Sequence, residues 1–78
     1  MQRMPRVTGE AAVKALEKAR FEVIDRSASH VYLHRWMGFA WTERVTVPVH
    51  GGKTIKLKTL SSILKQAHLS VEKFINYL

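Results

Sequence analysis

The sequence predicts an α+β domain in which helices cover one face of a three-stranded antiparallel sheet, in the element order α-β-β-β-α-α. Apolar residues recur at helical spacing near both ends of the chain and alternate with polar residues in the middle. A chain of 78 residues allows one thin core and no second domain. We therefore treat residues 1–78 as a single domain.

The first predicted helix runs from Thr8, whose side chain can cap its N-terminus, to Ala19 or Arg20. Its apolar residues stand at helical spacing: Ala12, Val13, Leu16 and Ala19. Arg20 occupies the position after the helix at which glycine is most comfortable. The residues of Phe21–Arg26 favour a strand, and Ser27–Ser29 favours a short turn.

Two alternating segments, His30–Arg35 and Arg44–His50, predict a hairpin that turns within Trp36–Glu43. Val31 and Leu33 share one face in the first segment, and the second segment has three valines on one face. Both faces lie in one core only if the numbers of the two residues in each cross-strand pair sum to an even value. A sum near 78 sets His30 opposite Pro48 and leaves His50 diagonal to His30 on the outward face.

The last third of the chain predicts two more helices. Gly51-Gly52 ends the strand, and Lys53–Lys58 forms a basic connector. Thr59 is the expected N-cap of the second helix, and Ser70 is the expected N-cap of the third. Both helices carry an apolar stripe at i, i+3, i+4, i+7 spacing: Leu60, Ile63, Leu64, Ala67 and Val71, Phe74, Ile75, Leu78.

The charge balance predicts a polyanionic partner. Thirteen Lys and Arg residues face six Asp and Glu residues, which gives a formal net charge of +7. The absence of cysteine excludes a disulfide scaffold, thiolate zinc ligands and a cysteine nucleophile. No apolar run reaches ~18 residues and no signal peptide is recognisable at the N-terminus, so we expect a cytoplasmic protein that does not enter membranes.

The outward face of the predicted sheet carries an unusual set of side chains: His30, Tyr32, His34, Arg44, Thr46 and His50. Histidines beside a cation suit metal-independent cleavage of RNA, because imidazole can take a proton from a ribose 2′-OH and imidazolium can give one to the leaving oxygen. A solvated strand face is the alternative. A histidine metal site is disfavoured, because His30 and His34 are roughly 13 Å apart along a strand.

Two further features suggest binding surfaces. Lys53, Lys56 and Lys58 precede the Thr59 helix, where lysines and a helix N-terminus together favour phosphate, although a solvated basic loop is the alternative. Three aromatic residues stand at the hairpin tip: Trp36, Phe39 and Trp41. They can stack on bases, cover the core or contact a partner, and we favour partner contact or local packing over stacking.

Over essentially its whole length the chain resembles the HicA (YcfA-like) toxins of toxin–antitoxin pairs. The resemblance rests on the order and spacing of short motifs: Pro5–Gly9, Ala28–Val31, Val45–Gly52, Ile55–Lys56, Thr59–Ala67 and Leu69–Phe74. It implies a double-stranded-RNA-binding-domain-like fold, metal-independent cleavage of mRNA and a HicB antitoxin that masks the site. The family motif Gly-Ser-His aligns with Ala28-Ser29-His30, which assigns the catalytic role to His30.

The chain departs from that family in four places. Ala28 replaces the glycine of the motif, and Arg20, Lys58 and His68 stand where family members often carry glycine. These departures suggest a weakened or specialised toxin.

We therefore expect an RNA endonuclease toxin that needs no cofactor or metal and acts on mRNA or other single-stranded RNA. His30 is the expected proton-transfer residue. The expected RNA-binding residues are Ser29, Arg44, His50, Lys53, Lys56 and Lys58. The alternatives are a non-catalytic RNA-binding module on the same fold and a basic protein-interaction domain.

Overall fold

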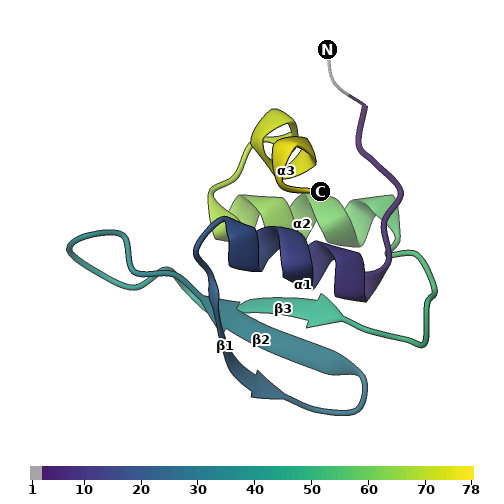
Figure 1. The fold of residues 1–78 in the computed structure, drawn as a ribbon, viewed down its shortest axis with the longest axis horizontal. Helices are drawn as coiled ribbons and strands as arrows, with labels where there is room; N and C mark the ends of the chain where they lie inside the picture. The colour runs from purple at the N-terminus through teal and green to yellow at the C-terminus, as the bar shows by residue number, and fades with distance from the viewer. Residues whose placement is uncertain (1–2) are drawn as a thin grey trace.

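A three-stranded antiparallel sheet carries all its helices on one side in the computed structural model, which describes residues 3–78 (Figure 1). The elements along the chain are α1 (Gly9–Lys18), β1 (Glu22–Arg26), β2 (His30–His34), β3 (Val45–Pro48), α2 (Leu57–Ala67) and α3 (Val71–Tyr77). The predicted fold class and element order are confirmed. Among residues 3–78, no helix is long and apolar enough to cross a bilayer.

The sheet has the order β1-β2-β3, and its hairpin register is the predicted one. His30 pairs with Pro48 and Leu33 pairs with Val45, so that opposed numbers sum to 78. The inward side chains of β2 and β3 are fully buried: Val31, Leu33, Val45 and Val47. The regular strands are shorter than predicted, because pairing ends at His30–Pro48 and Leu33–Val45 and leaves Arg44 and His50 just outside β3.

Strand β1 is an edge strand whose five residues are all exposed. Its pairing with β2 is interrupted between Val23 and Asp25, so that the strand does not present one regular apolar face. Arg26 connects β1 to α1, because its guanidinium forms a bidentate ion pair with the Glu10 carboxylate at 3.2 and 3.3 Å. A bulge and charged side chains are devices that discourage pairing of an exposed edge with another chain.

Helices α1 and α2 lie side by side over the sheet, and α3 lies on their far side (Figure 1). The predicted caps of α1 and α3 are confirmed: Thr8 Oγ1 accepts from the Ala11 amide at 3.1 Å, and Ser70 Oγ accepts from the Lys73 amide at 3.1 Å. The apolar stripes of α1 and α2 are buried in one core, into which α3 inserts Phe74. The α3 stripe is therefore only partly buried, and its last member, Leu78, remains 46% exposed.

The predicted start of α2 at Thr59 is wrong. The helix begins at Leu57, its N-cap is Lys56, and no side chain caps it. The reason is tertiary: Ile55 is buried, and its amide donates to the Val7 carbonyl at 2.8 Å. With the chain fixed at Ile55, the helix starts at once, so Lys58 and Thr59 lie in its first turn.

Two residues with positive φ end the first two helices. Arg20 has φ 75° after α1, and His68 has φ 56° after α2. Each end carries the same pair of hydrogen bonds, which for α1 are Arg20 N–H to Glu17 O and Phe21 N–H to Leu16 O. This pattern is the Schellman motif, which glycine favours. The prediction that glycine would suit position 20 is therefore confirmed.

At Gly9 the start of α1 lies against the end of β3. Gly9 is buried, and a Cβ atom built on it would overlap the Pro48 carbonyl oxygen and the Val49 side chain. Only glycine therefore lets the start of α1 lie directly on the end of β3.

Candidate active site

The backbone of His30 is fixed by the turn that enters β2. The Ser27 amide donates to the His30 carbonyl at 2.8 Å, and Ser27 Oγ accepts from the His30 amide at 3.1 Å. On the other side, the Val49 amide donates to the Ser29 carbonyl at 2.8 Å. Sequence reasoning missed the part played by Ser27, although serine at the start of a turn is a known signal for such side-chain hydrogen bonds.

The ring of His30 is oriented by its neighbour. Ser29 Oγ lies 2.9 Å from His30 Nδ1, and both residues are at least partly accessible to solvent. When Nδ1 carries the proton and donates it to Ser29, the lone pair of Nε2 remains free to act as a base. Ser29 is therefore placed to orient the ring of His30, and the RNA contact expected of Ser29 stays a prediction.

A second imidazole stands beside the first. The ring centroids of His30 and His50 are 6.2 Å apart, and the rings are close to perpendicular at 76°. His50 is exposed and follows the end of β3, so the two histidines come from different segments. The predicted diagonal placement on the outward face brings them together.

The remaining residues of the outward face divide into two groups. Tyr32 lies next to His30, with ring centroids 6.3 Å apart, and Arg44 lies over the Tyr32 ring at 4.9 Å. His34 belongs elsewhere, because it stacks on Trp41 with ring centroids 3.9 Å apart. The structure thus places Arg44 near His30 through Tyr32, and it removes His34 from the histidine cluster.

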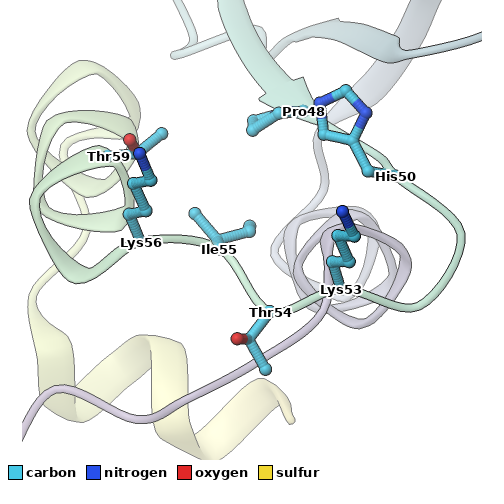
Figure 2. A pocket seen from close by; sticks show the side chains of 7 residues that line it. All are labelled: Pro48, His50, Lys53, Thr54, Ile55, Lys56 and Thr59. Carbon is cyan, nitrogen blue, oxygen red and sulfur yellow. The ribbon is translucent and has the colours of Figure 1, made fainter.

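A pocket of about 330 Å³ opens beside His50, between the end of β3 and the start of α2 (Figure 2). Its lining residues are Pro48, His50, Lys53, Thr54, Ile55, Lys56 and Thr59. Lys53 and Lys56 therefore meet at one pocket, which we call the lysine pocket. Lys58, in the first turn of α2, is not among the residues that line it.

The donor set does not form a metal site within residues 3–78, since no three His, Asp or Glu side chains are grouped to hold an ion.

Ala28 needs no glycine-like backbone: among residues 3–78, the non-glycine positions with positive φ are Arg20 and His68. The replacement of the motif glycine by Ala28 therefore does not strain the turn that carries His30.

Comparison with known proteins gives one finding. The family model described as the HicA toxin of bacterial toxin–antitoxin matches residues 9–69. This match covers α1, the whole sheet, α2 and both histidines of the site. No curated protein and no solved structure matches the chain.

Proposed function

Since the chain belongs to the HicA toxin family of bacterial toxin–antitoxin systems, we propose that it is an RNA endonuclease in which His30 transfers the proton. The observation that carries this proposal is the pairing of His30, oriented by Ser29 at 2.9 Å, with a second imidazole whose centroid is 6.2 Å away. A base and an acid on either side of one phosphate are what metal-independent RNA cleavage requires.

The reaction that we propose assigns one proton transfer to each histidine. His30 Nε2 removes the proton from a ribose 2′-OH, and the 2′-oxygen attacks the adjacent phosphorus. The bond from phosphorus to the 5′-oxygen breaks, and protonated His50 gives its proton to that oxygen. The products are a 2′,3′-cyclic phosphate and a 5′-OH, and the two histidines finish with their protonation states exchanged.

The lysine pocket supports the same proposal from the side of binding. Lys53 and Lys56 border the same space as His50 (Figure 2). The free amides at the start of α2 add partial positive charge there. A phosphate next to the scissile one fits this pocket, and Arg44 supplies a further cation beside Tyr32 at 4.9 Å.

The family also implies a HicB-type antitoxin as partner. We propose that this partner covers the outward face around His30 and so blocks access of RNA. The net charge of +7 favours an acidic partner, because opposite charge speeds encounter.

Cleavage of a single-stranded RNA by the purified chain in the presence of EDTA tests the proposal. We expect His30→Ala to lower the rate by ~10²–10⁴, with the circular dichroism spectrum unchanged. His50→Ala should also lower the rate with the spectrum unchanged, because the proposed mechanism gives this residue the role of general acid.

A substrate with 2′-deoxyribose at the scissile position is the control for chemistry, and it should resist cleavage. Equal cutting of this substrate, or full activity of folded His30→Ala, would overturn the mechanism. Tight binding of RNA without cleavage would instead favour a non-catalytic RNA-binding module.

A further inference from the structure

The segment between β2 and β3 projects beyond the sheet (Figure 1) and carries three exposed aromatic residues. Trp36, Phe39 and Trp41 are 51%, 83% and 49% exposed, and we call this group the aromatic tip. Apolar exposure of this kind on a small domain marks a binding surface.

The aromatic tip is held in shape by its own hydrogen bonds. Trp36 and Trp41 form an antiparallel bridge, and the Met37 amide donates to the Ala40 carbonyl at 2.8 Å. At the base, the Thr42 amide donates to the Arg35 carbonyl at 2.8 Å. The rings are therefore exposed on an ordered hairpin, which lowers the entropy that binding must overcome.

Trp41 also joins the tip to the active site. It stacks on His34 with centroids 3.9 Å apart and an angle of 13° between the planes. Along β2, His34 shares the outward face with Tyr32, and Tyr32 stacks at 6.3 Å on His30. A row of rings thus leads from His30 to the aromatic tip.

We propose that the aromatic tip is a stacking platform for bases of the single-stranded RNA that lies across the outward face, a proposal that rests on the proposed function. Bases have planar faces that stack on aromatic side chains without regard to sequence. Arg44, which covers the Tyr32 ring at 4.9 Å, places a cation for the RNA backbone along the same row. Two acidic residues belong to this region: the Glu22 carboxylate lies 3.9 Å from His34 Nε2, and Glu43 precedes Arg44 in the chain. Stacking through the bases keeps the RNA phosphates away from these carboxylates.

The geometry predicts which nucleotides use the platform. His30 and His34 are four residues apart on one strand, which corresponds to roughly 13 Å. A base on Trp41 therefore belongs to a nucleotide separated from the scissile phosphate by at least one other. A dinucleotide that occupies the active site does not reach the tip, whereas a hexanucleotide does.

Tryptophan fluorescence of the chain tests this directly, since both of its tryptophans are in the tip. The test uses His30→Ala protein, which binds RNA without cutting it. A hexanucleotide should quench the emission, and a dinucleotide at saturating concentration should not. Phe39→Ala in the same background should weaken hexanucleotide binding roughly 5- to 150-fold, as expected when one base no longer stacks.

Leu78→Ala is the matched control, because it removes another exposed apolar side chain, on the opposite layer of the fold. It should leave the affinity unchanged. Unchanged emission on hexanucleotide binding, together with unchanged affinity of Phe39→Ala, overturns the proposal. A change of emission with a HicB-type antitoxin but not with RNA also overturns it and assigns the tip to protein contact. Cleavage by the native chain is measured in a separate assay. If the chain does not cleave RNA, the fluorescence result still shows whether RNA binds at the aromatic tip.

Discussion

Replacing Arg20 or His68 by glycine should stabilise the protein. Both residues adopt a left-handed backbone, with φ 75° and φ 56°, at the ends of α1 and α2. For a residue with a Cβ atom this conformation costs roughly 1–2 kcal/mol. Glycine removes that strain, and the Schellman hydrogen bonds at both ends need only backbone atoms.

The size of the gain follows from two opposing terms. Relief of strain contributes roughly 1–2 kcal/mol, and the greater freedom of glycine in the unfolded chain offsets roughly 0.5–1 kcal/mol of it. Each substitution should therefore raise the free energy of unfolding by about 0–1.5 kcal/mol, with a midpoint of about 0.75 kcal/mol. In a domain of this size, about 1 kcal/mol shifts the melting temperature by roughly 4–8 °C, so at the midpoint each variant should melt about 3–6 °C higher.

Thermal and urea unfolding followed by circular dichroism measures this, with Lys58→Gly as the comparison. Lys58 lies inside the first turn of α2, where the backbone is helical. Glycine should therefore cost up to about 1 kcal/mol there. If all three variants changed stability in the same direction, backbone conformation would not be the cause and the reasoning would fail.

Three other outcomes are expected. Replacing both lysines of the lysine pocket by glutamine should reduce the slope of log RNA affinity against log salt concentration by about 0.7 for each phosphate that is no longer neutralised. Lys73→Gln on α3 is the control and should keep the native slope. Equal slopes for the two variants would remove the pocket from the binding site. A HicB-type antitoxin should protect amides around His30 from hydrogen exchange, and protection confined to α3 with cleavage still inhibited would require an allosteric account instead. The Arg26 guanidinium donates to Glu10 and lowers the pKa of this carboxyl. The ion pair therefore contributes stability above the ordinary glutamate pKa, and this contribution is lost as the pH falls through the lowered pKa. Glu10→Gln should weaken this part of the acid sensitivity in urea unfolding, and an unchanged pH profile would show that the pair has no effect.

The register of the hairpin was predictable because one-residue slips exchange buried and exposed faces. Because Val31 and Leu33 alternate with polar residues, the numbers of paired residues must sum to an even value. An even sum also places His50 beside His30 on the outward face. The proposed catalytic pair is thus encoded in the pattern of the strands. The orientation of His30 by Ser29 depends on a contact between neighbours, which alternation does not describe.

Other features depend on contacts between distant parts of the chain. Thr59 has a side chain suited to capping, but the bond from the Ile55 amide to the Val7 carbonyl fixes the chain before it, and the N-cap lies three residues earlier, at Lys56. Trp41 reaches back to His34, so the outward face is partly covered by its own hairpin. At the tip, Trp41 packs against His34 and remains half exposed, while Phe39 is largely exposed.

The close contact at Gly9 has a genetic consequence. Gly9 lies against Pro48 and Val49, and the Val49 amide holds the Ser29 carbonyl next to His30. Any side chain at position 9 would displace the Pro48–Val49 backbone. Among cells that survive expression of the toxin, alleles altered at codon 9 should therefore recur beside those that change His30 itself. Such alleles would yield a protein that is no longer toxic although every side chain of the proposed RNA site is still present.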